Sequence, residues 1–230
     1  MEVPIGWHSH KVRVRDGLMI VNYEKFRSGA DDFGGGLGIY DVSLPDRPRL
    51  ITHWKTGTQG GGVHRYDFDH RYAYISPTAP GYIGNIVKIL DLRDPAKPEE
   101  VGRWWIPGQH EAGGETYPWD NYVPPRCHHP LRMGNRLYVS YWHHGMFILD
   151  IEDMARPRLV SQFNTGPAHP HPTHGAAHTG VAQGPPDPGG GGRGRGQAAA
   201  VAAGLHLVLR HHGRAPAHAD LHLPGRRRGP

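Results

Sequence analysis

Histidines recur at one position of a repeated pattern in this chain. His10, His64 and His129 each stand eight residues before the first residue of an apolar run, and these first residues are Leu18, Tyr72 and Leu137. Neutral imidazole nitrogens are suitable ligands for zinc, copper, iron and nickel. Histidines that converge on one point would therefore form a transition-metal site. The alternative is a packing or hydrogen-bonding role that is common to all copies of the pattern.

A fourth histidine, His174, is expected at the same position of a further copy, at the end of the stretch His169-Pro170-His171-Pro172-Thr173-His174. The predicted metal ligands are thus His10, His64, His129 and His174, with copper, iron or zinc as the ion. Four neighbouring histidines are assigned supporting or surface roles, and these are His8, His128, His169 and His171.

Further polar residues are predicted near the same point, although the catalytic residues themselves are unknown. Glu111 and Glu115 stand in the long loop 107–126, and His143 stands in a turn between two apolar runs. These side chains are candidates for general acid–base catalysis or for additional ligation. The alternative for the glutamates is a solvated loop position.

Three copies of one sequence frame must position these residues. A strand-like run ends in Asp41, Asp91 or Asp150, and a proline follows seven residues later at Pro48, Pro98 or Pro157. A hairpin-like pair of β-runs precedes each aspartate, and another apolar run follows each proline. Each copy therefore predicts four short β-strands joined by turns that are rich in Gly, Asp, Asn and Pro.

Units of four strands and about 40 to 50 residues are typical of β-propeller blades. We predict an all-β fold, an incomplete β-propeller of about three four-stranded blades and the start of a fourth. The partial propeller is assigned to residues 1–174, with blades at about 7–56, 62–107 and 127–165 and a fourth that starts at 166–174. The alternative is an open β-sandwich of unrelated hairpins. In a propeller, the repeated histidines precede the innermost strand of each blade and so face a common axis.

The composition changes sharply after His174. Residues 175–230 contain no Lys, Glu, Ser, Asn or aromatic residue, and consist mostly of Gly, Ala, Pro, Arg and His. Such a segment cannot bury enough apolar surface to offset its chain entropy, so we predict a disordered tail. The missing amino acids are those with AT-rich codons, and we therefore interpret the tail as coding sequence read out of frame. A genuine low-complexity basic extension is the alternative.

The tail also explains the charge of the chain. Its seven arginines and two aspartates account for the whole formal excess of +5, so residues 1–174 are neutral. We therefore predict no nucleic-acid partner. No apolar stretch approaches the roughly 18 residues of a membrane span, no signal peptide is visible, and the one cysteine, Cys127, excludes an intramolecular disulfide. A soluble cytoplasmic protein without a membrane partner is expected, and its start inside a blade-like unit suggests further sequence upstream.

The repeated motif resembles the bacterial LVIVD-repeat family of β-propellers. The resemblance lies in Gly38-Ile39-Tyr40-Asp41-Val42, Val87-Lys88-Ile89-Leu90-Asp91-Leu92 and Phe147-Ile148-Leu149-Asp150-Ile151, each with its proline seven residues after the aspartate. It covers about residues 7–174 and is specific to the repeat, not to an activity. It implies a longer, closed propeller. The His-lined channel is more distantly similar to the selenium-binding protein and methanethiol oxidase propellers, in which channel histidines hold copper.

Two functions follow from these observations. The first is a metal-dependent oxidoreductase that admits a small-molecule substrate from the face bearing His143 and Glu111. The second is a non-catalytic propeller scaffold that binds a protein or a small molecule on its His-rich face.

Overall fold

The computed structural model describes residues 2–28, 32–57, 60–116 and 124–163 of the 230-residue chain. Thirteen strands and one short 3-10 helix make up the described part, which is otherwise turns and loops. The predicted all-β fold is confirmed. The predicted fourth blade start at 166–174 and the predicted tail at 175–230 lie outside the described residues.

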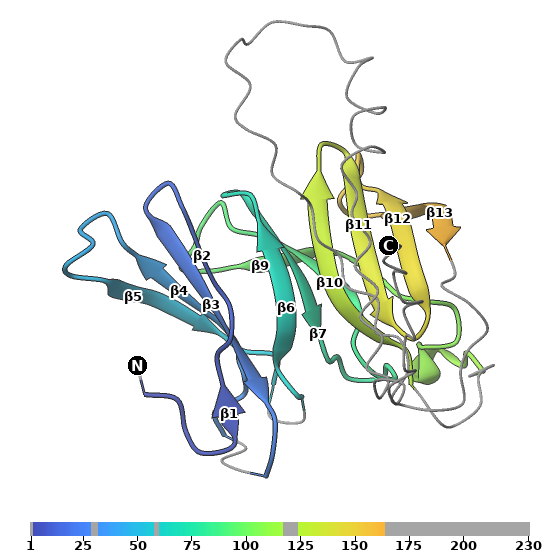
Figure 1. The fold of residues 1–230 in the computed structure, drawn as a ribbon, viewed down its shortest axis with the longest axis horizontal. Helices are drawn as coiled ribbons and strands as arrows, with labels where there is room; N and C mark the ends of the chain where they lie inside the picture. Colours follow the sequence, from blue (N-terminus) through green and yellow to red (C-terminus); the bar gives the residue numbers. More distant parts are fainter. Residues whose placement is uncertain (1, 29–31, 58–59, 117–123, 164–230) are drawn as a thin grey trace, which may run out of the picture.

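The strands form three antiparallel sheets that follow one another along the chain (Figure 1). The first contains β1 (Trp7–His8), β2 (Val12–Arg15), β3 (Leu18–Lys25), β4 (Gly36–Asp41) and β5 (Arg49–Trp54). The second contains β6 (Val63–Phe68), β7 (Tyr72–Pro77), β8 (Val87–Asp91) and β9 (Glu99–Trp104). The third contains β10 (Arg126–Met133), β11 (Arg136–Trp142), β12 (Gly145–Asp150) and β13 (Arg158–Phe163). The 3-10 helix η1 (Glu111–Gly113) lies in the loop between β9 and β10.

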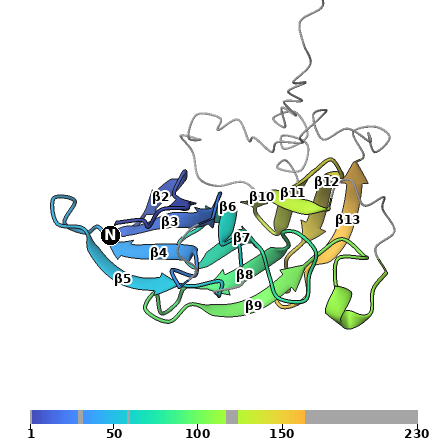
Figure 2. The same cartoon turned by 90° about the horizontal axis from the view of Figure 1, so that it is seen from below.

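Each sheet is a simple up-and-down meander, as expected of a propeller blade. The order is β6-β7-β8-β9 in the second blade and β10-β11-β12-β13 in the third. In the first blade, β2 pairs with one half of the long strand β3 and β1 pairs with the other half. The three blades stand side by side, with β2, β6 and β10 along one side (Figure 2). The predicted incomplete propeller of four-stranded blades is confirmed.

Two hydrophobic clusters hold the blades together. Between the first and second blades, Ile20, Leu37 and Ile39 pack with Tyr66, Ile75 and Leu90, all of them buried. Between the second and third blades, Val87 and Ile89 pack with Leu137, Val139 and Leu149. The alternation of side chains along the strands explains this pattern, because one face of each blade packs against a face of the next. Burial of these aliphatic and aromatic side chains is the main stabilising contribution to the arrangement.

A close approach of two backbones joins the first blade to the start of the second. Glu24 of β3 and Gly62 form an isolated β-bridge, and Lys25 N–H donates to the carbonyl of Gly61 at 2.8 Å. Gly62 has a φ of 82°, and a Cβ atom at this position would lie 2.2 Å from the Tyr23 carbonyl oxygen. Only glycine permits this contact. It fixes Glu24 beside the first residues of β6.

Within the described ranges, no helix has the length and apolar character needed to cross a membrane.

Candidate metal centre

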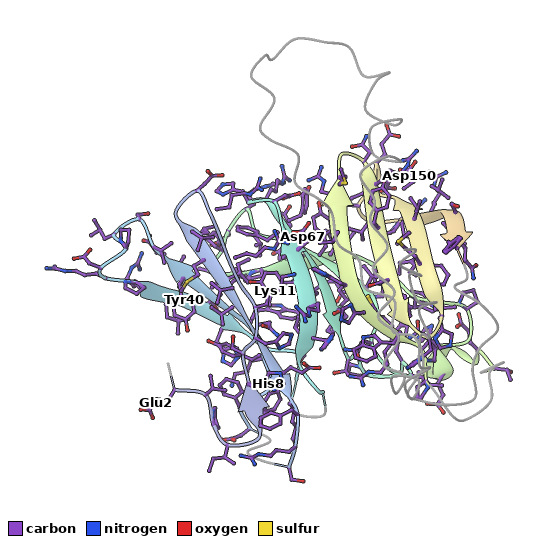
Figure 3. All side chains as sticks on the ribbon, in the orientation of Figure 1. Glu2, His8, Lys11, Tyr40, Asp67 and Asp150 are labelled. Atoms are coloured by element: carbon purple, nitrogen blue, oxygen red, sulfur yellow. The ribbon has the colours of Figure 1, made fainter. Side chains whose placement is uncertain are left out.

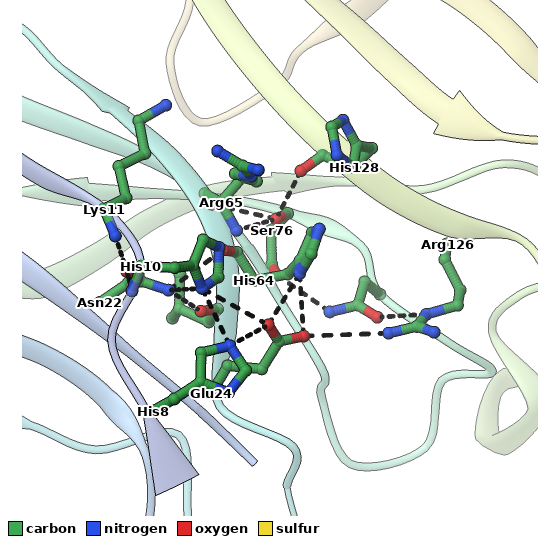
Figure 4. Close-up of polar contacts among 12 residues, drawn as sticks. His8, His10, Lys11, Asn22, Glu24, His64, Arg65, Ser76, Arg126 and His128 are labelled. Carbon is green, nitrogen blue, oxygen red and sulfur yellow. Dashed lines mark hydrogen bonds and ion pairs between the residues drawn. The ribbon is translucent and has the colours of Figure 1, made fainter. Parts of the chain in front are cut away.

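A half-buried carboxylate, that of Glu24, gathers several nitrogen-bearing side chains around it (Figure 4). Its Oε2 lies 2.8 Å from Nδ1 of His64, 3.5 Å from Nε2 of His8 and 3.9 Å from Nδ1 of His10. Its Oε1 lies 3.9 Å from a terminal nitrogen of Arg126. Strand pairing positions the group, because His8 of β1 is the direct partner of Glu24 on β3.

Three of these side chains present ligand atoms at metal-binding separations. His8, His10 and Glu24 each offer one atom, and all three atoms lie within 4.8 Å of one another. Nε2 of His8 is 3.0 Å from Nδ1 of His10. With metal–ligand bonds of 2.0–2.2 Å, tetrahedral ligands stand about 3.3 Å apart, so small shifts would bring the three atoms onto one ion.

The side chain of Asn22 fixes the position of the two inner histidines. This fully buried amide accepts hydrogen bonds from the backbone N–H groups of His10 and Lys11, at 3.3 and 2.9 Å. It donates to the carbonyls of Val63 and His64, at 2.9 and 3.1 Å. One amide thus ties the inner strand of the first blade to that of the second. It also stands 3.4 Å from Nδ1 of His10, with the amide as donor.

His64 turns its two ring nitrogens toward different environments. Nδ1 contacts both oxygens of Glu24, at 2.9 and 2.8 Å. A donor at Nδ1 leaves the lone pair on Nε2, and this buried atom has no hydrogen-bond partner within the described part of the chain. A histidine that donates one nitrogen to a carboxylate and turns the other toward a ligand is common in metal sites. The unpaired Nε2 is therefore the clearest indication that this region binds a ligand.

The charge states at neutral pH suit cation binding. Burial, followed by the charge of Arg65, lowers the pKa of His10 to about 4. Burial acts to raise the pKa of Glu24, but the hydrogen bond and charge of His64 outweigh it and lower that pKa below its usual value. His10 is therefore neutral with a lone pair available, and Glu24 is an ionised carboxylate.

Strand register places His128, not His129, in the position equivalent to His10 and His64. Leu18, Tyr72 and Arg136 pair with the aspartates that end the third strands, Asp41, Asp91 and Asp150. The residues eight positions before these three are His10, His64 and His128. The sequence pattern instead placed the start of the second strand of the third blade at the apolar Leu137, one residue after Arg136. That one-residue slip selected His129 in place of His128, which stands at a register shift of β10 between Cys127 and His129.

Ring contacts agree with this corrected register. The rings of His10 and His64 lie 5.3 Å apart between centroids, and those of His64 and His128 lie 5.1 Å apart. Trp142 packs against His128 at 5.2 Å and closes this side of the group. The three histidines form a continuous row across three blades, here called the histidine row.

His129 has other surroundings. Its Nε2 lies 2.5 Å from Nζ of Lys11 and 3.2 Å from the carbonyl oxygen of Tyr66. Burial, followed by the charge of Lys11, lowers the pKa of His129 to about 2. It is thus a neutral, nearly buried ring in the layer next to the histidine row. His174, the fourth predicted ligand, lies outside the described residues, as do His169 and His171.

The three weak catalytic candidates lie away from these contacts. Glu111 is exposed in η1. Glu115 accepts hydrogen bonds from Trp105 Nε1 and from the backbone of Gly108 and His110, which indicates a structural role in its loop. His143 occupies the β11–β12 turn at a φ of 62°, with its ring 6.3 Å from that of Trp142.

The repeated sequence pattern did not identify several residues of the site. His8 was assigned a supporting role, although its ring nitrogen belongs to the closest group of ligand atoms. Glu24 and Asn22 are not among the residues that the sequence predicted for the site. A polar residue inside the otherwise apolar run 18–23 is the feature that could have pointed to Asn22.

Comparison with protein families agrees with the repeat that the motifs predicted. Residues 133–165 match the LVIVD repeat, a span that starts at the end of β10 and covers β11, β12 and β13. The third blade thus carries an LVIVD repeat. No curated protein matches the chain. The more distant similarity to the selenium-binding propellers stays a prediction.

Proposed function

We propose that this LVIVD-repeat propeller binds a divalent transition metal ion through His8, His10 and Glu24. The observation that carries the proposal is the meeting of two imidazole nitrogens and one carboxylate oxygen within 4.8 Å. His64 supports the set from behind, because its Nδ1 orients the Glu24 carboxylate. Asn22 holds His10 from the other side.

The chemical type of the donors narrows the choice of metal. Two histidines and one carboxylate are the ligand set of catalytic zinc sites and of non-haem iron(II) oxygenases. Among copper, iron and zinc, the carboxylate favours iron and zinc. Three protein ligands leave open positions, which is the arrangement of a catalytic site rather than a closed structural one.

The activity we propose is that of a metal-dependent oxidoreductase acting on a small molecule. When bound, the ion would supply Lewis-acid or redox chemistry. The protein would contribute a neutral His10, an ionised Glu24 and the row of rings from His64 to Trp142 as an apolar wall. The half-buried position of Glu24 would limit the access of water to the ion.

A second candidate is a non-catalytic scaffold that binds a protein or small molecule on this face. The contact between Nε2 of His8 and Nδ1 of His10, at 3.0 Å, favours it. These two rings can satisfy each other by a hydrogen bond, with one nitrogen as donor and the other as acceptor, so the cluster has a structural explanation that needs no ion.

Metal analysis of the purified full chain separates the two candidates. We expect close to one equivalent of iron or zinc after purification without chelators, or after reconstitution under anaerobic conditions. Glu24→Gln and His8→Ala should lower metal affinity about 10-fold to 100-fold or more. His70→Asn is the matched control, because His70 is an exposed histidine outside the cluster and Asn tolerates its φ of 86°. Substoichiometric metal in the wild type, or equal affinity in Glu24→Gln and His70→Asn, would favour the scaffold.

A further inference from the structure

A second layer of nitrogen-bearing side chains lies next to the histidine row. Lys11, Arg65 and His129 each follow one member of the row, and they stand opposite Asn22, Ser76 and Ser140 on the second strands. They thus occupy equivalent positions on three successive inner strands. We call Lys11, Arg65 and His129 the basic layer.

The members of the basic layer lie close together although they come from three blades. Nζ of Lys11 is 2.5 Å from Nε2 of His129, across 118 positions of sequence. The charge of Arg65 lowers the pKa values of Lys11, His10 and His129, although burial has the largest effect on each. The side chains of Lys11 and Arg65 extend to the same side of the His10 and His64 rings (Figure 4). His8 and Asp67 lie toward opposite ends of the inner strands, with Lys11 between them (Figure 3).

Positive charge in this layer exceeds the negative charge that faces it. Asp67 is the acidic group closest to it, and its carboxylate is shared with Arg13 at 3.3 Å and with the backbone N–H of Arg132 at 3.0 Å. Glu24 is engaged by His64.

Arg65 is the member that lacks a partner. Its backbone is held by Ser76 Oγ, which lies 2.9 Å from its nitrogen and 3.0 Å from its oxygen. Its side-chain Nε is buried and has no hydrogen-bond acceptor, and within the described ranges the guanidinium forms no ion pair. An unsatisfied buried donor of this kind costs about 1–3 kcal/mol, and more when the group is charged. A protein retains such a group where a ligand satisfies it.

We propose that the basic layer binds an oxyanion, such as the carboxylate or phosphate group of a small molecule, between Lys11 and Arg65. A guanidinium offers two parallel N–H donors to a carboxylate or phosphate, and an ammonium adds a third. Nε2 of His129 accepts a hydrogen bond from the Lys11 ammonium and holds it in place. The bound anion balances the excess positive charge and satisfies the Nε donor of Arg65.

The position of this site sets the kind of molecule it would take. Arg65 directly follows His64 in β6, and Lys11 directly follows His10. A ligand anchored here by an anionic group would therefore extend toward the histidine row and the Glu24 carboxylate. The anion site itself requires no metal, so it stands or falls independently of the proposed metal centre.

Titration calorimetry with inorganic phosphate tests the proposal on the full chain. The protein is first treated with EDTA to remove any metal and is then dialysed into EDTA-free buffer at pH 7 and constant ionic strength, because EDTA is itself a carboxylate anion. We expect Arg65→Met and Lys11→Met to weaken phosphate binding by about 10-fold or more, since a hydrogen bond to a charged group contributes about 1.5–3 kcal/mol. Arg47→Met is the matched control, because Arg47 is 82% exposed. A parallel titration with acetate distinguishes a carboxylate ligand from a phosphate ligand.

Arg65→Lys keeps the proposal testable if Lys11→Met does not fold. It retains the charge but not the paired donors, and it should bind phosphate with an affinity between those of wild type and Arg65→Met. Circular dichroism confirms the fold of each variant. Absence of phosphate and acetate binding in the wild type, or equal affinity in Arg65→Met and Arg47→Met, would overturn the anion site. Loss of metal binding in Glu24→Gln with phosphate binding intact would contradict neither this site nor its location.

Discussion

Nδ1 of His64 lies 2.8 Å from Oε2 of Glu24, whereas Nε2 of the same ring is buried without a partner. One nitrogen of the ring therefore contacts the first blade, and the other has no hydrogen-bond partner among the described residues. This asymmetry connects the packing of two blades to the chemistry proposed between them. It also means that substitutions of His64 act on stability and on binding through different atoms.

His64→Ala should destabilise the fold by about 1–3 kcal/mol at pH 7, because it leaves the ionised Glu24 without its main hydrogen-bond donor. Glu24 has a lowered pKa, so its contribution is present above the unfolded pKa and is lost as the pH falls through the folded pKa. The difference between wild type and His64→Ala should therefore shrink when unfolding in urea is repeated near pH 4. A difference that stays constant with pH would indicate that lost packing, not the ion pair, explains the effect.

Asn22→Ala should be more costly, by about 2–4 kcal/mol, since it removes the partners of two backbone N–H groups and two carbonyls at once. Metal affinity should fall as well, because His10 loses its support. Asn135→Ala is a suitable control, since Asn135 is an exposed turn residue between β10 and β11. Equal midpoints of urea unfolding for the two variants would contradict the role assigned to Asn22.

The repeated motif allowed the fold to be predicted from the sequence. The spacing of Asp41, Asp91 and Asp150 from their prolines marked three equivalent units, and each became a four-stranded sheet. The local alternation of apolar residues and the turn residues agree with that arrangement, so short-range preferences and tertiary packing point the same way.

The site was harder to predict for two physical reasons. First, a one-residue uncertainty about where β11 begins exchanged His128 for His129, and an irregularity of β10 between Cys127 and His129 hides the register. Second, Glu24 approaches His64 only because Gly62 lets β3 contact the segment before β6. Such a long-range backbone contact leaves no periodic signal in the sequence. His8 joins the cluster for the same reason, through its pairing with Glu24.

Stability should decrease as the pH falls below about 6.5. The pKa values of His10 and His129 are lowered to about 4 and about 2, mainly by burial, so both stay neutral in the folded chain while the unfolded chain takes up protons. Each such histidine lowers the free energy of unfolding by up to about 1.4 kcal/mol per pH unit in that window. Urea unfolding at pH 7, 6 and 5 measures the slope.

His129→Gln provides the matched comparison for this pH dependence. The amide can still hydrogen-bond to Lys11 or the Tyr66 carbonyl but does not titrate, so the variant should show a shallower loss of stability between pH 6.5 and pH 5. His70→Asn should keep the wild-type slope, because His70 is exposed. Identical slopes in His129→Gln and wild type would show that His129 is not protonated on unfolding in this range.

The last prediction concerns equivalent positions on the outer strands. Val101 and Val160 both follow the aspartate of their blade by ten residues, and Trp104 and Phe163 both follow it by thirteen. Val101 and Trp104 of the second blade pack against the core of the third, whereas Val160 and Phe163 are 53% and 55% exposed. Val101→Ala should therefore destabilise the protein by about 1–2 kcal/mol, because buried methyl groups are lost. Val160→Ala should change stability by less than about 0.5 kcal/mol. If both variants lose a comparable amount of stability in urea unfolding, the flank of the third blade is covered in solution, as the flank of the second blade is covered in the structure.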